Sequence, residues 1–175
     1  MQMQSSSTSP APPTSLAEVR AHDQVMRYHR AGAGRPLVLL RSAAGPDALW
    51  PELEVQLVAR FRVFTPELPP DCEDVAAWVK GFLEGVGLDR VVIVAADPCC
   101  LSALELALLG APQIDRLVLV PGGLAGETGL DGTLATAYAG MSVPLLVVRR
   151  GLSAAEALPL LQQFLEHDGT TAAVG

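Results

Sequence analysis

Basic side chains are scarce in this 175-residue chain, which has 12 Lys and Arg against 19 Asp and Glu and a formal net charge of −7. No run of Lys or Arg forms the basic stripe that a nucleic-acid-binding surface needs, so we exclude that class of function. Charged residues make up only 18% of the chain and hydrophobic residues 50%. This balance is typical of one folded domain with a sizeable core.

Long uninterrupted hydrophobic runs are also missing. The longest apolar stretch, residues 91–110, contains Asp97, Pro98 and Glu105, which favours a strand followed by a helix over a membrane span. The opening residues MQMQSSSTSPAPPTS have neither the basic nor the apolar region of a signal peptide. Their composition predicts a disordered tail over residues 1–17, followed by a single domain over residues 18–175.

Cysteine and histidine are rare, with three of each. Without an export signal, three cysteines indicate a soluble protein of the reducing cytoplasm. Cys99 and Cys100 are predicted to lie in the first turn of a helix, where the helix dipole lowers a thiol pKa. Burial as small packing side chains is the favoured interpretation over a reactive thiol. No Cys or His has metal-ligand spacing, so neither a metal nor a cofactor is expected.

Apolar β-rich runs alternate with amphipathic helical runs through the rest of the chain. This order predicts an α/β fold, a mostly parallel doubly wound sheet with helices on both faces, whose ligands bind at the carboxyl ends of the strands. Strands are expected within residues 23–32, 36–42, 61–68, 90–96, 116–122, 144–150 and 170–174, and helices within 45–60, 71–87, 99–110, 132–140 and 153–169. Asp71 or Asp74 is expected to cap the second helix, and Gly85 or Gly87 to end it.

Two long segments carry a resemblance to a known family. YHRAGAGRPLVLLRSAAGPDALWPELEVQLVARFRVFTPELP, residues 28–69, resembles the opening of α/β-hydrolase-fold proteins, where a hairpin leads to a strand ending in His-Gly-x-x-Gly, a helix and a second strand. FLEGVGLDRVVIVAADPCCLSALELALLGAPQIDRLVLVPG, residues 82–122, resembles the part that carries the family's Gly-x-Ser-x-Gly motif. The resemblance implies an α/β-hydrolase-like fold and a nucleophile after the strand at 90–96.

The motif at that nucleophile is altered. Residues 95–99, Ala-Ala-Asp-Pro-Cys, occupy the place of Gly-x-Ser-x-Gly, which puts Asp97 at the nucleophile position. Relatives that resemble haloalkane dehalogenases and epoxide hydrolases use Asp there. Pro98, however, has no backbone N–H to donate to an oxyanion hole. We therefore favour Asp97 as the N-cap of the following helix, with Pro98 at its first position, over Asp97 as a nucleophile.

The oxyanion and acid positions of the family are altered as well. Residues 41–45 stand in place of His-Gly-x-x-Gly and keep only its second glycine; within them Ala43 corresponds to the other oxyanion donor. Residues 149–153 contain no acid where the family often has one, which leaves Glu127 or Asp131 as alternative acids. Roughly twenty residues separate the strands at 116–122 and 144–150, too few for a helical cap domain, so any pocket is expected to be open.

The general base is missing from its expected place beyond the last strand. His22 and His29 lie at or in an N-terminal strand, and His167 lies at a helix end, where it is interpreted as a partner of the helix dipole. Arg149 and Arg150 are interpreted as a solvated pair rather than as an anion site. Without a base, neither Ser nor Asp chemistry of this family completes its cycle.

These observations lead to a hypothesis and two alternatives. The hypothesis is a pseudoenzyme with an α/β-hydrolase-like fold that acts through a protein partner or as a homo-oligomer, at the sheet edge formed by residues 144–148 or 170–174. The first alternative is a small esterase-like or dehalogenase-like hydrolase using Asp97, with a base from an unexpected position or another subunit. The second is a shortened gene product with no selected function. Neither a nucleic-acid nor a membrane partner is expected.

Overall fold

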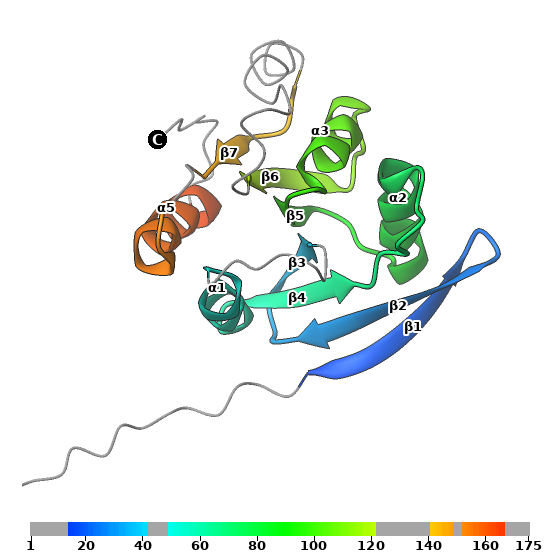
Figure 1. Ribbon diagram of the computed structural model, residues 1–175, viewed down its shortest axis with the longest axis horizontal. Helices are drawn as coiled ribbons and strands as arrows, with labels where there is room; N and C mark the ends of the chain where they lie inside the picture. Colours follow the sequence, from blue (N-terminus) through cyan, green and yellow to red (C-terminus); the bar gives the residue numbers. More distant parts are fainter. Residues whose placement is uncertain (1–13, 42–48, 122–140, 149–151, 167–175) are drawn as a thin grey trace, which may run out of the picture.

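The computed structural model describes residues 14–41, 49–121, 141–148 and 152–166 (Figure 1). In these ranges seven strands form one sheet in the order β1-β2-β4-β3-β5-β6-β7. The strands are β1 (Ser15–Ala21), β2 (Gln24–Ala31), β3 (Arg35–Leu40), β4 (Phe61–Pro66), β5 (Val91–Ala96), β6 (Ile114–Val120) and β7 (Leu145–Val147). The helices are α1 (Leu49–Val58), α2 (Val75–Val86), α3 (Cys100–Leu108) and α5 (Ala154–Glu166).

The sheet is mostly parallel, as the alternation of strands and helices predicts. β3 pairs in parallel with both β4 and β5, and β6 pairs in parallel with β5 and β7. The antiparallel pairs are β1 with β2 and β2 with β4. The predicted strands within residues 36–42 and 90–96 are therefore adjacent, parallel and central, which confirms the expected fold class.

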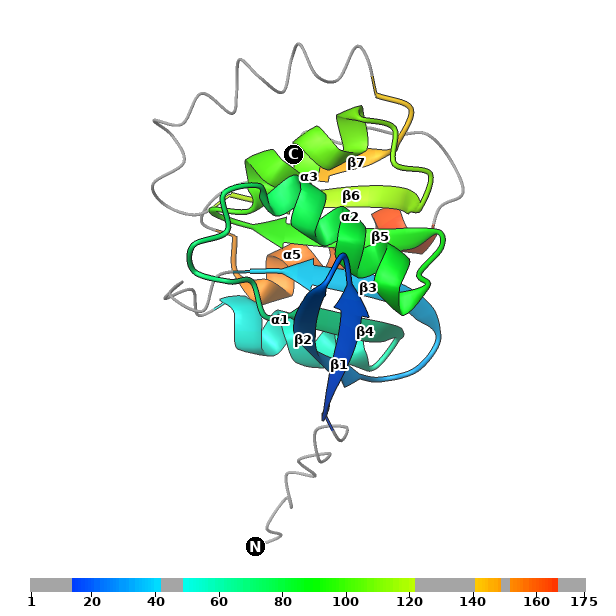
Figure 2. The same cartoon turned by 90° about the vertical axis from the view of Figure 1, so that its right-hand side faces the viewer.

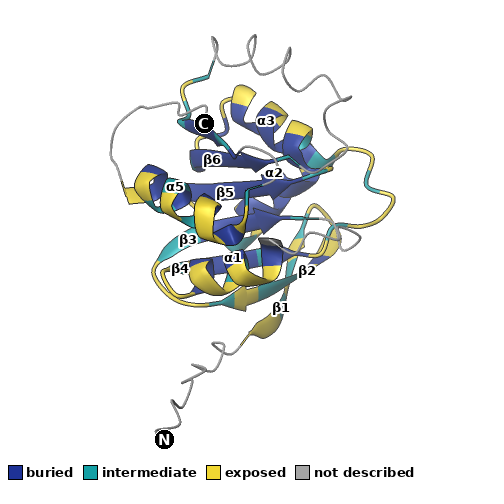
Figure 3. Cartoon of the chain, turned by 60° about the vertical axis from the view of Figure 1, so that its left-hand side comes forward, coloured by how far each residue is buried: buried dark blue, intermediate teal, exposed yellow. Residues whose placement is uncertain are grey.

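Two helical layers cover the sheet and explain why its central strands are apolar without interruption. All six residues of β5 are buried. Ile93 and Ala95 point to the face covered by α2 and α3, and Val92 and Val94 point to the face covered by α1 and α5. The two pairs of helices lie on opposite sides of the sheet in Figure 1. In Figure 3 the outward faces of α1 and α5 are exposed, while the strands beneath them are buried.

Helix α2 begins and ends at residues that the sequence offers as alternatives. The Asp74 side chain accepts a hydrogen bond from the Ala77 N–H at 2.8 Å, so Asp74 rather than Asp71 is the N-cap. The C-cap is Gly87, with φ of 70°, a left-handed conformation that glycine adopts without a Cβ clash. Gly85 therefore lies inside the helix.

The N-terminal hairpin differs from the sequence-based expectation. β1 begins at Ser15, so residues 15–17, which the composition assigns to the disordered tail, pair with β2. The hairpin of β1 and β2 forms one edge of the sheet, and β1 contacts α2 (Figure 2). Residues 1–13, the helix expected within 132–140 and the strand expected within 170–174 lie outside the described residues. No helix in the described ranges is long and apolar enough to cross a membrane.

Two glycines of α2 mark how closely the hairpin approaches the helix. A Cβ added at Gly85 comes within 2.9 Å of the Ala21 Cβ, which moves only if the strand moves. A Cβ added at Gly81 meets the Nδ1 atom of His22 at 2.9 Å, the end of a side chain that turns away at little cost. A side chain at Gly85 would therefore clash with β1, whereas a side chain at Gly81 would only displace the His22 ring.

We expect Gly85→Ala to lower the free energy of unfolding by about 1–3 kcal/mol through overpacking against β1. The matched variant Gly81→Ala should be neutral or stabilising by up to about 1 kcal/mol, because alanine favours the helix. Urea denaturation of the two variants and the wild type measures both effects. Equal stability of the two variants would show that the hairpin does not pack tightly on α2.

Candidate functional site

A cavity of about 730 Å³ lies at the carboxyl ends of neighbouring strands. Arg41 follows β3, residues 65–70 end and follow β4, and Pro98 and Cys99 follow β5; all of them line the cavity, together with His29 of β2. Parallel strands end at the same edge of a sheet, so segments far apart in the sequence meet here. The cavity lies where the sequence predicts that ligands bind.

The chain makes a turn between β5 and α3, and this turn corrects the predicted helix start. The Cys99 N–H donates to the Ala96 oxygen at 2.7 Å, which closes a turn around Asp97 and Pro98. The peptide bond between these two residues is cis. α3 starts at Cys100, with Cys99 at the N-cap position and no side-chain cap. The interpretation of Asp97 as N-cap is therefore wrong, because the turn uses three residues before the helix begins.

The nucleophile position of the resemblance is thus occupied by a half-buried Asp97 inside a turn, followed by an exposed Pro98. A proline nitrogen carries no hydrogen, so this position donates no hydrogen bond to a developing oxyanion. The second expected donor, Ala43, lies outside the described residues. So do the other predicted site residues, Glu127, Asp131, Arg149, Arg150 and His167.

The two adjacent cysteines are buried, which confirms packing as their favoured role. Burial, followed by the negative charge of Asp97 and then by Cys72, raises the pKa of Cys99 to about 11. Burial and Asp97 raise the pKa of Cys100 still further above the usual thiol range, and Cys100 Sγ donates to the Ala95 oxygen at 3.3 Å. Burial and the Asp97 carboxylate both raise these pKa values, so both thiols stay protonated at neutral pH.

His29 is the functional candidate that sequence reasoning placed in a strand but not in a site. It is paired with Thr65 in the antiparallel register of β2 and β4, which brings it to the cavity. Its Nε2 atom lies 3.3 Å from Glu67 Oε1, and both side chains are about half exposed. His22 Nε2 lies 3.9 Å from Glu84 Oε2, away from this edge. Only the register between β2 and β4 could have revealed the position of His29.

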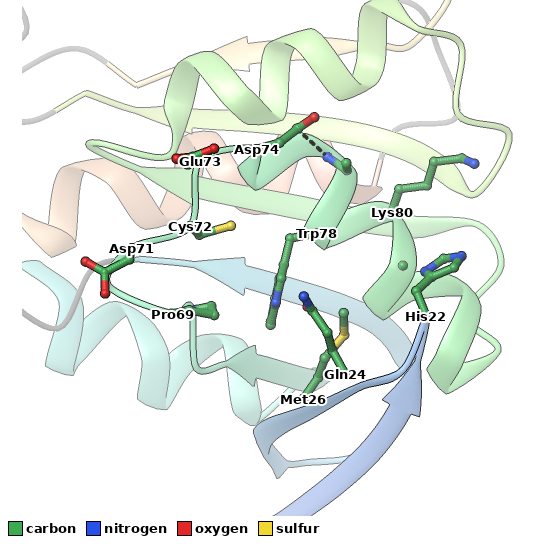
Figure 4. A pocket seen from close by; sticks show the side chains of 12 residues that line it. His22, Gln24, Met26, Pro69, Asp71, Cys72, Glu73, Asp74, Trp78 and Lys80 are labelled. Atoms are coloured by element: carbon green, nitrogen blue, oxygen red, sulfur yellow. Dashed lines mark hydrogen bonds between the residues drawn. The ribbon is translucent and has the colours of Figure 1, made fainter.

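A second cavity, of about 690 Å³, lies between the β1–β2 turn and the start of α2 (Figure 4). Trp78 projects into its middle toward Met26, and its ring stacks on Phe82 at 6.0 Å. Asp71 and Glu73 lie on one side of Trp78, and His22 and Lys80 lie on the other. Asp74 lies above Trp78, at the start of α2. Within the described residues no group of three His, Cys, Asp or Glu could hold a metal ion.

Comparison with known proteins agrees with this architecture. No family model matches the chain. A curated 2-hydroxy-6-oxononadienedioate/2-hydroxy-6-oxononatrienedioate hydrolase from Dechloromonas aromatica is 27% identical over 123 residues, which cover 61% of this chain and 43% of that protein. The crystal structure of a bacterial membrane phospholipase A matches with a TM-score of 0.58 at 14% identity, covering 91% of this chain and 78% of that one. The epoxide hydrolase CorEH matches with a TM-score of 0.52 at 24% identity, covering 62% and 42%.

The strand order, the helical layers and these matches define the class of protein: the chain has the fold of the α/β-hydrolase superfamily. The matched region is less than half the length of the curated relative. The function of this chain therefore has to be inferred from the altered residues at the strand ends and not from the fold.

The raised pKa of Cys99 predicts a loss of stability at alkaline pH. Below pH 9.0 the thiol is protonated in both the folded and the unfolded state. Between pH 9.0 and about 11 the unfolded thiol ionises while the folded thiol keeps its proton, so the unfolded state gains stability. We expect the free energy of unfolding of the wild type to fall faster over this interval than that of Cys99→Ala, measured by urea denaturation with a reductant present. Parallel pH profiles of the two proteins would contradict the assignment.

Proposed function

We propose that this chain is an α/β-hydrolase-fold protein without hydrolytic turnover, which acts by association with a second copy of itself or with another protein chain. The observation that carries the first half of the proposal is Pro98. Removing one oxyanion donor costs related enzymes about 3 kcal/mol of transition-state stabilisation, a rate loss of roughly 10²–10³-fold. Proline at this position removes the donor from the backbone itself.

The groups around Pro98 add to this argument. Cys99 and Cys100 are held protonated by burial and by Asp97, so neither is a ready nucleophile. His29, which shares the cavity with Pro98, contacts Glu67. These features favour a site that has lost the family's chemistry over one that performs it in a modified form.

Exposed apolar side chains near the β7 edge support association. β7 has three residues, and among the described strands it pairs only with β6. α3, which packs on β5 and β6, exposes Leu101 and Leu108 one heptad apart, and Leu109 follows at 73% exposure. A sheet edge beside an exposed apolar helix face is a surface that proteins usually cover by pairing or docking.

One observation favours a second candidate, a hydrolase that uses Asp97. The turn that holds Asp97 adjoins the cavity that also contains His29, and the matched relatives named above are hydrolases. In such an enzyme the Asp97 carboxylate would displace the leaving group of the substrate to form a covalent ester, and a base would then activate a water molecule that hydrolyses this ester.

Substitution of Asp97 separates the two candidates. We expect the wild type, Asp97→Asn and Asp97→Ala to hydrolyse p-nitrophenyl esters and haloalkanes no faster than buffer, because the oxyanion site lacks a donor at Pro98. Initial rates measure this, and thermal unfolding checks that each variant is folded. Turnover by the wild type that Asp97→Asn abolishes, or an ester on Asp97 detected by mass spectrometry, would establish the hydrolase instead.

The association surface has a test of its own. We expect the wild type to form a dimer or larger assembly at high micromolar concentration, and Leu101→Glu/Leu108→Glu to weaken it at least about tenfold by placing charge in the apolar contact. Val55→Glu is the matched control, because Val55 is 51% exposed on α1, on the opposite face of the sheet. Light scattering over a dilution series measures the assembly. A monomeric wild type that copurifies with no partner contradicts the proposal.

A further inference from the structure

Arg41 lines the 730 Å³ cavity and uses few of its hydrogen-bond donors. Its Nη2 donates to Glu54 Oε2 at 3.3 Å, a long contact. Its Nε–H is buried and has no acceptor. A guanidinium carries five N–H donors, and a buried donor without an acceptor costs free energy. The Nε atom itself has no accessible surface, so a ligand in the cavity would meet the Nη donors of this partly exposed side chain.

Apart from Arg41, His29, Thr65 and Glu67, the described residues of the cavity wall are proline, aliphatic or cysteine side chains. Four of its residues are proline and therefore carry no backbone N–H: Pro66, Pro69, Pro70 and Pro98. Leu68 and Val75 add aliphatic surface, and the Cys99 thiol is protonated. A ligand that fills this space gains from apolar contact along most of its length. The polar end of such a ligand would lie at Arg41, because the guanidinium donates hydrogen bonds there.

We propose that this cavity is a binding site for a small apolar monocarboxylate, an aliphatic or aromatic acid, whose carboxylate contacts the Arg41 guanidinium while its body packs against Leu68 and Pro98. A carboxylate suits this site better than a neutral carbonyl, because hydrogen bonds between two ionised groups are roughly twice as strong as neutral ones. The cavity volume lies in the range typical of small-molecule sites. Binding needs no chemistry at Asp97 and is independent of the association proposed above.

The surrounding carboxylates set the charge of the preferred ligand. Glu54 contacts Arg41, and Glu67 contacts His29, so each of the two basic side chains that line the cavity already has an acidic neighbour. A dianion such as phosphate would face repulsion from two carboxylates, whereas a monocarboxylate adds one charge beside one guanidinium. Because Glu54 already pairs with Arg41, we expect the monocarboxylate to bind with moderate rather than tight affinity.

The experiment titrates octanoate and benzoate into the full chain, up to about 10 mM, with calorimetry and methyl NMR as readouts. We expect saturable binding of at least one acid by the wild type and at least about tenfold weaker binding by Arg41→Gln, through loss of a charge-assisted hydrogen bond. Arg60→Gln is the matched control, because Arg60 is also paired with a glutamate, Glu166, but does not line the cavity. It should bind like the wild type.

Neutral analogues and NMR mapping decide between the remaining outcomes. Octanamide should bind at least about tenfold more weakly than octanoate, and octanoate should shift the methyl signals of Leu68 and Val75 in the wild type. Equal binding of octanamide, no saturable binding of either acid, unchanged binding by a folded Arg41→Gln, or shifts confined to Met26 in the second cavity would each overturn the proposal. The wild-type mapping remains decisive if Arg41→Gln does not fold.

Discussion

Strand β5 is buried along its whole length, with β3 and β6 hydrogen-bonded in parallel on its two sides and a helical layer on each face. Such a strand has no polar surface of its own, and its backbone groups are satisfied only by its neighbours. Because the neighbours are parallel, their carboxyl ends meet at one edge, where the polar and reactive residues that follow them gather. The cavity, the turn at Asp97 and the position of Arg41 all depend on this arrangement.

The same burial explains why the thiols beside the cavity stay protonated at neutral pH. Cys99 and Cys100 lie at the start of α3, where a helix dipole alone would stabilise thiolates. Removal from water and the nearby carboxylate of Asp97 act in the opposite direction and raise the pKa of both thiols. The edge of the sheet thus holds two cysteines whose thiols keep their protons at neutral pH.

The sequence predicts the strands and helices with long apolar periodic patterns well. It predicts the residues at which one element ends and the next begins less well. The adjacency of β3 and β5 and the end of α2 near Gly87 agree with expectations drawn from the sequence. Strand β1 was not anticipated, because its exposed face leaves a weak apolar pattern. The N-cap of α3 is Cys99, two residues after the expected Asp97, because a turn and a helical cap use the same residue types and only hydrogen-bond geometry separates them.

By itself the sequence determined the α/β order, the parallel sheet and the missing donor at Pro98, since the first two follow from local periodicity and the third from covalent structure. The tertiary structure alone decided that His29 lies beside Glu67, that Cys99 keeps its proton, and that Arg41 borders an apolar cavity. These properties depend on distances and burial between segments far apart in the chain. Pairing of distant strands sets those distances, and no local pattern in the sequence records them.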